Sequence, residues 1–452
     1  MYYSPYLKQF EKALKKLDHW RKSYDGDGSV KPEVNLEAVL SELITRLKGN
    51  YPFHHPRYAG QMLKPPHPVA WLAYSLAMTI NPNNHALDGG PPTSEMEKEV
   101  MQILANMVGY DDHFLGHLTT GGTIANLEAL FIAREIHPEK AIASSANAHY
   151  THARMCHVLG VRHLTVPTNH EGIPDPEFIA DHADEIGTLV VTAGTTGLGI
   201  VEPLHTLLQI TEKSGIRIHL DAAYGGFFKI LQGSGLIADE PWKCMSLADS
   251  IVIDPHKHGL QPYGCGSVLF KDPAAGRFYK HDSPYTYFTS DDLHLGEISL
   301  ECSRAGASAA ALWATFKLLP PDRSSGLGTI LSSCRKAAVL FSEAIDKSNK
   351  FRMYNKPDLD ICAYFPNPKE NSLSQISSLS KSIFEMGMQL RESGFYLSLY
   401  KVPSETFCSK YPDFTGDEKE VTILRSVLMK PEHEDFIPEL TKMLEESFCE
   451  SI

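Results

Sequence analysis

Between residues 114 and 270, short apolar runs alternate with segments long enough to form helices. Apolar runs of this length, bounded by polar turns, are typical of buried strands. Their alternation with helices predicts an α/β fold, with a mostly parallel seven-stranded sheet covered by helices on both faces. The predicted strands are 114–118, 141–144, 163–166, 188–193, 216–220, 250–253 and 266–270. The predicted helices are 123–136, 151–159, 176–185, 204–213 and 242–248.

The rest of the chain follows other patterns and suggests three parts. Residues 1–90 are helical and irregular, and we expect a large sheet-containing domain at 91–325 and a smaller α+β domain at 326–452. In the last part the predicted helices are 328–347, 374–393 and 434–446, and the predicted strands are 359–365, 395–402 and 422–429.

Composition restricts the function classes. The 452 residues are 42% hydrophobic and 21% charged, which is ordinary for a globular protein with a large core. The net charge is −13 and no basic block is present, so nucleic acid is not an expected partner. The N-terminus lacks the apolar stretch of a signal peptide, and the most apolar run, residues 69–80, is too short to span a bilayer. Eight scattered cysteines fit reduced thiols in the cytoplasm.

The segment 254–259 (Asp-Pro-His-Lys-His-Gly) follows the predicted strand 250–253. Most lysines lie on solvated surfaces, so a loop lysine is the ordinary interpretation of Lys257. A lysine held at the end of a buried strand can instead have a lowered pKa and form a Schiff base with an aldehyde. Ligands of parallel sheets bind at these strand ends, which makes Lys257 a candidate nucleophile.

Other predicted strands are also followed by segments whose residues can bind a ligand or take part in a reaction. Residues 119–123 (Thr-Thr-Gly-Gly-Thr) lead into a helix, and this arrangement favours an anion such as phosphate. His149 can lie flat against an aromatic ring, and Asp221, followed by two alanines, can pair with a pyridinium nitrogen. Each has an ordinary alternative, namely a capped helix start, a histidine bonded to backbone, and an aspartate bonded to nearby N–H groups.

Two further ligand types fit the sequence poorly. Residues 194–197 (Gly-Thr-Thr-Gly) faintly resemble a dinucleotide loop but do not open a GxGxxG helix. His149, His152 and the pair Cys156-His157 suggest a metal, but no second Cys/His pair stands at a suitable spacing. We therefore predict no metal site.

Taken together, these segments resemble the group II pyridoxal-phosphate-dependent amino-acid decarboxylases. The family includes aromatic-amino-acid, histidine, glutamate and archaeal tyrosine/aspartate decarboxylases, and sphingosine-phosphate lyase is a near relative. The similarity covers residues 50–320 and extends more weakly to the C-terminus. It implies a fold-type I transferase-like architecture, pyridoxal 5'-phosphate as cofactor, and a homodimer with its site at the subunit interface.

The resemblance also implies roles for individual residues. Lys257 would bind the cofactor as a Schiff base, Asp221 would face its ring nitrogen, and His149 would stack on the ring. The residues implied in the remaining cofactor contacts are Gly121, Gly122, Thr123, Thr195, Ala223 and His256. Arg304 would bind the substrate carboxylate, and Tyr287, on a loop between the last sheet strand and Arg304, would donate the proton that replaces carbon dioxide. Packing of the loop aromatics onto a partner subunit is the alternative for Tyr287.

The expected reaction is removal of the α-carboxylate of an L-amino acid. The residues 50–95 contain Phe53, Tyr58, His67 and Tyr74 but no obvious Arg or Lys candidate for a side-chain carboxylate, which favours an aromatic substrate such as tyrosine. A carbon–carbon lyase of the sphingosine-phosphate-lyase type and a non-catalytic paralogue are the alternatives. The presence of both Lys257 and Asp221 argues against the paralogue.

Overall fold

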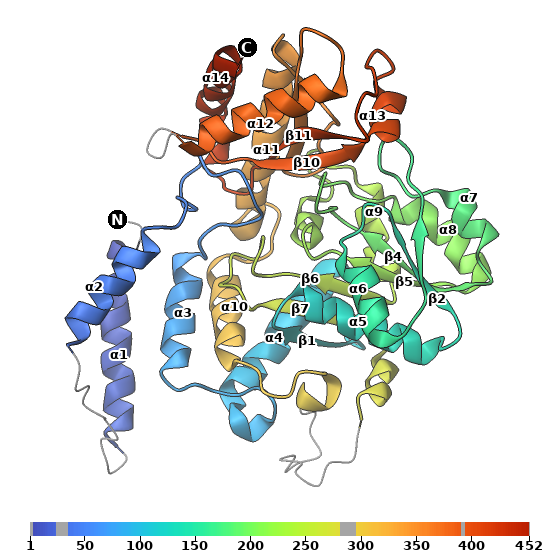
Figure 1. Cartoon of the computed structure of the whole chain (residues 1–452). Coiled ribbons are helices and arrows are strands. Elements are labelled where there is room, and N and C mark those ends of the chain that lie inside the picture. Colours follow the sequence, from blue (N-terminus) through green and yellow to red (C-terminus); the bar gives the residue numbers. More distant parts are fainter. Residues whose placement is uncertain (1–2, 24–34, 281–294, 390–393, 452) are drawn as a thin grey trace.

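The computed structural model describes residues 3–23, 35–280, 295–389 and 394–451. Its larger sheet has seven strands: β1 (Leu115–Thr119), β2 (Ala141–Ser145), β3 (His163–Val166), β4 (Ile186–Thr192), β5 (Arg217–Asp221), β6 (Ser250–Ile253) and β7 (Gly266–Phe270). The strand order is β1-β7-β6-β5-β4-β2-β3 (Figure 1). Strands β3, β2, β4, β5 and β6 pair in parallel, whereas β7 is antiparallel to both β6 and β1. The predicted mostly parallel seven-stranded sheet is therefore confirmed.

Both faces of this sheet are buried, which explains why most of its strand residues are apolar. In β6, Ile251 and Ile253 belong to one apolar core, and Val252, which points the other way, belongs to a second. The helices α5 (Gly122–Ile136) and α6 (Thr151–Leu159) cover the second face. The helices α4 (Pro91–Val108), α8 (Leu204–Ser214) and α10 (Gly306–Leu318) contribute to the first.

The second sheet has four antiparallel strands in the order β10-β11-β9-β8 and forms the upper part of Figure 1. Its strands are β8 (Phe351–Met353), β9 (Ile361–Pro366), β10 (Ser398–Pro403) and β11 (Glu420–Val427). The accompanying helices are α11 (Gly326–Lys347), α12 (Leu373–Gln389), α13 (Ser404–Lys410) and α14 (His433–Ser451). This is the predicted smaller α+β domain, while the boundaries at 90/91 and 325/326 stay a prediction.

Three predicted elements differ from the observed ones. Helix α7 (Pro176–Asp181) is shorter than the predicted 176–185, because the His182 ring nitrogen Nδ1 lies 2.8 Å from the Phe178 carbonyl at its end. Residues 395–397 do not begin β10. Tyr396 instead exchanges backbone hydrogen bonds with Arg57 and Ala59 of the N-terminal part. In place of the predicted helix 242–248, the structure has the short helix α9 (Glu240–Lys243) followed by the 3-10 turn Met245–Leu247.

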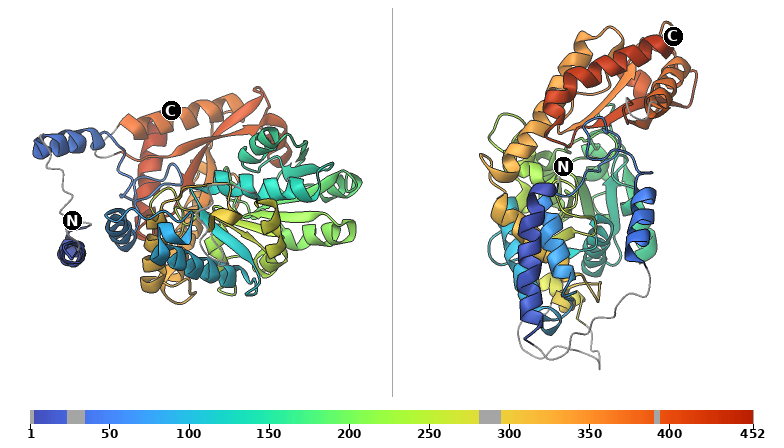
Figure 2. Two further views of the ribbon diagram at one scale, coloured as in Figure 1. Left: turned by 90° about the horizontal axis from the view of Figure 1, so that it is seen from below. Right: turned by 90° about the vertical axis from the view of Figure 1, so that its left-hand side faces the viewer.

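The N-terminal helices lie at one side of the molecule (Figures 1 and 2). Helix α1 (Leu7–Arg21) packs beside α3 (Pro68–Met78), where Phe10 contacts the ring of Trp71. Helix α2 (Leu36–Leu47) has no buried residue, and both views show it standing away from the body. Among the described residues, no helix combines the length and the apolar character needed to cross a membrane.

Glu202 joins the ends of two neighbouring strands. It is 1% exposed, and its carboxyl oxygens accept hydrogen bonds from the hydroxyl of Ser145 and from the backbone N–H of Thr192. Burial raises the pKa of this carboxyl to about 7. Because a carboxyl of the unfolded chain titrates near pH ~4.3, the folded state binds this proton more tightly.

We therefore expect Glu202 to make stability depend on pH between about 4 and 7. Its contribution is complete below the unfolded pKa and is lost as the pH rises through about 7. Glu202→Gln does not titrate; its amide oxygen accepts the Thr192 N–H and its NH2 group donates to the Ser145 hydroxyl, which can also accept. Its free energy of unfolding should lie close to that of the wild type at pH 4 and exceed it at pH 8, by up to about 4 kcal/mol at about 1.4 kcal/mol per pKa unit. Glu185→Gln, an exposed control, should show no such trend, and an equal gap at both pH values would contradict the assignment.

Candidate active site

A cavity of about 400 Å³ lies at the carboxyl ends of β1, β2, β4, β5 and β6. Because these strands run in the same direction, the segments that follow them meet at one edge of the sheet. The predicted residues that line the cavity are Gly121, Gly122, Thr123, His149, Asp221, Ala223, His256 and Lys257. Lining residues that the sequence did not single out for a cofactor include Thr192, Thr196 and Tyr224.

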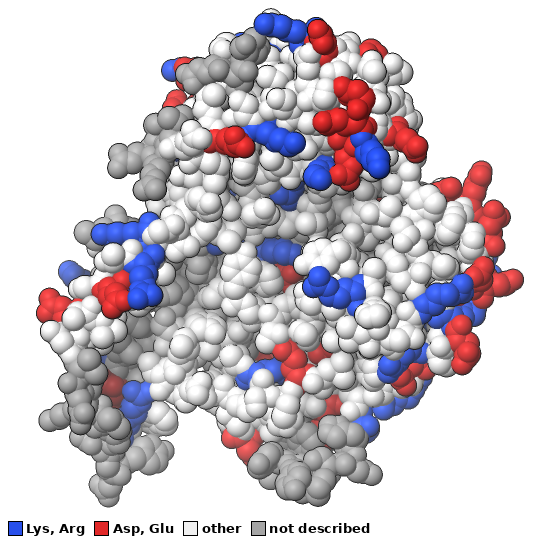
Figure 3. Space-filling view, in the orientation of Figure 1, with Lys and Arg blue, Asp and Glu red and all other residues white. Residues whose placement is uncertain are grey.

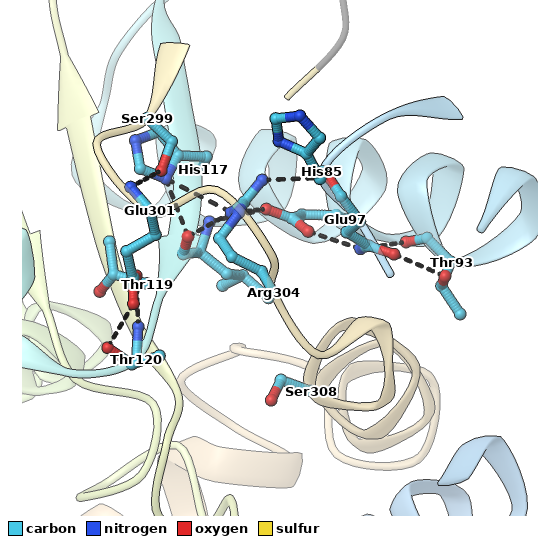
Figure 4. A network of polar contacts seen from close by, with 12 residues as sticks. His85, Thr93, Glu97, His117, Thr119, Thr120, Ser299, Glu301, Arg304 and Ser308 are labelled. Carbon is cyan, nitrogen blue, oxygen red and sulfur yellow. Dashed lines mark hydrogen bonds and ion pairs between the residues drawn. The ribbon is translucent and has the colours of Figure 1, made fainter. Parts of the chain in front are cut away.

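The turn between β1 and α5 has the geometry of an anion site. Gly121 has φ +150, a backbone conformation that side chains rarely adopt, and α5 begins at Gly122. A Cβ at Gly122 would lie 2.6 Å from Asp254 Oδ2, so only glycine leaves room there. The hydroxyl and N–H of Thr120 bind Glu301, so Thr120 is already engaged (Figure 4). The helix N-terminus and the glycines are suited to phosphate.

Lys257 reaches the cavity from a compact turn. Its N–H binds the Asp254 carbonyl at 2.9 Å, and its Nζ lies 3.0 Å from Asp254 Oδ2. The lysine side chain is 20% exposed, whereas that of Asp254 is 3% exposed. The amine is therefore open to a ligand and held by a buried carboxylate. The adjacent His256 is fixed by the Cys265 carbonyl, 2.8 Å from its Nδ1, and by the ring of Tyr263.

Asp221 is a buried carboxylate at the end of β5. Oδ1 accepts the Ala223 N–H at 3.1 Å, and Oδ2 lies 2.8 Å from His152 Nε2. Burial alone would raise the pKa of Asp221, but the hydrogen bond and charge of His152, together with the charge of Lys257, lower it below its ordinary value. The carboxylate therefore stays ionised in the cavity wall, where it can pair with a protonated ring nitrogen.

His152 was considered at the sequence level only as a metal ligand, and its contact with Asp221 was missed. It lies in the first turn of α6, and its ring is fully buried. The separation of 69 residues between the two partners leaves no local pattern to detect. Within the described residues, no group of three or more His, Cys, Asp or Glu side chains is arranged to hold a metal ion.

His149 lines the cavity beside His152. Its Nδ1 lies 2.6 Å from the Thr151 hydroxyl, and its ring centroid lies 4.3 Å from that of Tyr150. Burial lowers the pKa of the His149 imidazole, which favours a neutral ring. A neutral, oriented ring is suited to packing against a flat ligand.

Thr195, which was expected to contact the cofactor, does not line the cavity. Thr195 is 1% exposed, and its hydroxyl accepts the Ile200 N–H within its own loop. Thr196, the next residue, lines the cavity instead. The hydrogen bond between Thr195 and Ile200 closes the loop. The side chain of the next residue, Thr196, then faces the cavity.

The structure gives Arg304 a different environment from the one expected. Its guanidinium lies in a buried network (Figure 4), where Nη1 binds Glu97 at 2.8 Å and the Leu118 carbonyl, and Nη2 binds the Asn84 carbonyl at 3.4 Å. Arg304 is not among the cavity-lining residues. In this structure it fastens β1 to α4, and its guanidinium is not available to a substrate carboxylate in the cavity. Tyr287 lies outside the described residues.

The cavity fits a phosphate-bearing aromatic cofactor. It combines a glycine turn at a helix start, an ionised carboxylate, a lysine amine and an alanine, all within about 400 Å³. Two buried polar atoms of its lining, Thr192 Oγ1 and Asp254 Oδ1, have no hydrogen-bond partner among the described residues. Acidic and basic side chains are interspersed over the outer face drawn in Figure 3.

Comparisons with known proteins agree with this geometry. A family model described as "Pyridoxal-dependent decarboxylase conserved domain" matches residues 32–364. The chain is 27% identical to an L-tyrosine decarboxylase of Enterococcus faecium, over 92% of this chain and 90% of that protein. It is 28% identical to a probable L-tyrosine/L-aspartate decarboxylase of Methanosphaera stadtmanae, over 77% of this chain and 85% of that protein.

Solved structures share the fold. The tryptophan decarboxylase of Catharanthus roseus, in complex with L-tryptophan, matches with a TM-score of 0.76 and 17% identity over 98% of each chain. The expected fold-type I architecture is confirmed by this likeness and by the two sheets.

His152 gives a test of how Asp221 is held. In His152→Phe the buried space stays filled, but Asp221 loses the ring nitrogen at 2.8 Å. A buried carboxylate without this partner costs about 1–3 kcal/mol, so we expect pyridoxal phosphate to bind roughly ten-fold more weakly, measured by absorbance titration. His163→Phe, which removes a histidine bonded to Ser144 on the neighbouring strand pair, is the control and should bind normally. Equal affinity in wild type and His152→Phe would refute the role of His152.

Proposed function

The chain belongs to the pyridoxal-dependent decarboxylase family, and from that premise we propose that the cavity at the carboxyl edge of the large sheet is the active site. The protein is an amino-acid decarboxylase, a carboxy-lyase that uses pyridoxal 5'-phosphate. The observation that carries the site assignment is the meeting of Lys257, Asp221, His149 and the glycine turn in one cavity. They come from segments far apart in the sequence.

The proposed roles follow from the chemistry of each group. Lys257 binds the cofactor aldehyde through its Nζ, and Asp221 holds a proton on the ring nitrogen. When bound, pyridoxal phosphate accepts the electron pair left on the substrate carbon as carbon dioxide departs. His149 packs on the cofactor ring, and the small side chain of Ala223 leaves room for the cofactor ring on the cavity wall.

The cofactor phosphate is assigned to the cavity end that α5 faces. Gly121, Gly122 and Thr123 supply N–H groups and a hydroxyl, and Thr196 and His256 complete the lining. Asp254 lies close to this end, since a Cβ on Gly122 would touch it. An acidic side chain repels phosphate, so we assign Asp254 to the lysine amine, 3.0 Å away, rather than to the phosphate.

For the substrate we propose an L-amino acid with an uncharged aromatic side chain, such as tyrosine. Of the described residues that line the cavity, Lys257 is the one Lys or Arg, so a side-chain carboxylate has no second cation to pair with. The similarity to an L-tyrosine decarboxylase supports this choice. The cavity lining does not include the aromatic residues of the N-terminal part, namely Phe53, Tyr58, His67 and Tyr74. Their presence therefore gives no support for an aromatic substrate.

Aspartate is the second candidate, because one of the relatives is a probable L-tyrosine/L-aspartate decarboxylase. The reported family model and relatives are those of decarboxylases, which supports decarboxylation over carbon–carbon cleavage of the sphingosine-phosphate-lyase type. We further propose, from the resemblance alone, that Tyr287 donates the proton after decarboxylation. The cytoplasmic location stays a prediction.

We propose a homodimer as the working form. Helix α2 carries apolar side chains that are between 46% and 56% exposed, namely Leu36, Val39, Leu40, Leu43, Ile44 and Leu47. A contiguous apolar face of this kind is typical of an interaction surface. A second copy of the chain is the partner that is always present at equal concentration.

The cofactor assignment predicts distinct effects of two substitutions. Lys257→Ala should abolish turnover and the absorption band of the covalently bound cofactor. Asp221→Asn should keep the band but lose most turnover, about 100-fold or more, because the ring nitrogen is no longer held protonated. Absorbance spectra and amine release measure the two effects. An undiminished band in Lys257→Ala, or near-normal turnover in Asp221→Asn, would refute the assignments.

The substrate is tested by amine formation over a panel of L-amino acids. We expect tyrosine or another aromatic amino acid to give kcat/KM at least about ten-fold above aspartate and glutamate, since an unpaired buried carboxylate costs more than ~1.4 kcal/mol. Preference for aspartate or glutamate would overturn the aromatic proposal while leaving the decarboxylase assignment intact.

A further inference from the structure

The small domain contacts the loop that follows β4 through polar groups. Arg425, on β11, donates from Nη2 to the Thr196 carbonyl at 2.7 Å and from Nε to the Gly197 carbonyl at 2.9 Å. Asp358 accepts the Val201 N–H at 3.0 Å. The small domain therefore forms part of the support behind one wall of the active-site cavity.

A third polar side chain of the small domain reaches two further cavity loops, those that follow β5 and β6. Asp360 lies just before β9, and its Oδ1 accepts the hydroxyl of Tyr224 at 2.6 Å. Its Oδ2 lies 3.2 Å from Nε2 of His258. Tyr224 lines the cavity, and His258 directly follows Lys257. One carboxylate thus contacts both the segment after Asp221 and the turn that carries the lysine.

This contact is entirely buried. The side chains of His258 and Asp360 are each 0% exposed, and the His258 ring lies edge-on to Tyr224 and Phe228, with both centroid separations at 4.9 Å. Burial alone would raise the pKa of Asp360, but His258 and the Tyr224 hydroxyl lower it. A buried carboxylate loses several kcal/mol of hydration, so removing one of its partners is strongly destabilising.

The turn that His258 belongs to has an unfavourable backbone. Leu260 has φ +62, a left-handed conformation that is unusual for a leucine. A Cβ on Gly259 would lie 2.7 Å from Pro255, so the turn is also tightly closed. Strained backbone persists only where the surrounding structure holds it. The contact between Asp360 and His258 is placed to do so, directly after Lys257 and two residues before Leu260.

We propose that Asp360 is a positioning residue, which through His258 and Tyr224 fixes the turn that presents Lys257 to the cofactor. The inference rests on the proposed cofactor-binding role of Lys257. It makes the small domain a contributor to cofactor binding without any direct contact with the cofactor. Loss of the pair lets the turn relax, and the lysine amine then spends less time where it can bind.

The test is a double-mutant cycle on binding of pyridoxal phosphate. His258→Phe keeps a ring between Tyr224 and Phe228, and Asp360→Leu removes the carboxylate. Each should raise the dissociation constant about ten-fold and change the absorption band of the bound cofactor. Because both remove the same contact, the double variant should bind no more weakly than the weaker single variant. Asp360→Asn, which keeps an acceptor for Tyr224, should give an intermediate loss.

Apo-protein melting separates positioning from stability. Without His258 the buried Asp360 carboxylate keeps Tyr224 but loses its ion-pair partner, so His258→Phe should melt at a lower temperature than the double variant, which removes the carboxylate as well. Restored melting with unrestored cofactor affinity in the double variant is the expected signature. It also keeps the test valid if either single variant folds poorly.

Asp413→Asn is the control, because it alters an acid of the small domain that pairs with Arg352 and contacts no cavity loop. It should bind the cofactor within two-fold of the wild type. Unchanged affinity and absorption in His258→Phe and in the double variant would overturn the proposal, even if both melt early. The proposed function fails separately, if Lys257→Ala retains the band.

Discussion

When a parallel sheet is buried on both faces, ligand-binding and catalytic side chains can reach a ligand only from the ends of its strands. The strands β2, β4, β5 and β6 are mostly apolar, apart from residues such as the buried His219 in β5, and ligand-binding side chains follow where each strand ends. The ends of parallel strands coincide in space, and this single constraint brings Asp221, Lys257, His149 and the glycine turn into one cavity.

The second constraint is electrostatic. Several charged groups are buried in or behind the cavity wall, and three of them have partners from distant parts of the chain. Asp221 has His152, Arg304 has Glu97, and Asp360 has His258 and Tyr224. Such pairs contribute little net stability, but removing one member leaves a buried charge, so they specify one arrangement strongly. The geometry of the site is thereby tied to residues that never touch a ligand.

The sequence predicted the sheet and most of the cavity, because both depend on local patterns. Continuous apolar runs identified the strands, and glycine, Asp221 and Lys257 stand at their ends. Helix α10 has no comparable signal, since it is rich in alanine and buried on several sides and so lacks an amphipathic period. Thr195 and Thr196 cannot be distinguished by pattern, because a shift of one residue decides which side chain faces the cavity. Arg304 could not be placed, because its partners Glu97 and Leu118 lie about 200 residues away.

Arg425 contacts the loop after β4 through main-chain carbonyls, those of Thr196 and Gly197, and not through side chains. The neighbouring Tyr400 leaves no space for a Cβ on Gly197, so the backbone path is fixed there. The docking of the two domains is therefore indifferent to the side chain at 196. A substitution at Thr196 would therefore change a side chain that lines the cavity while the hydrogen bonds between Arg425 and the loop stay in place.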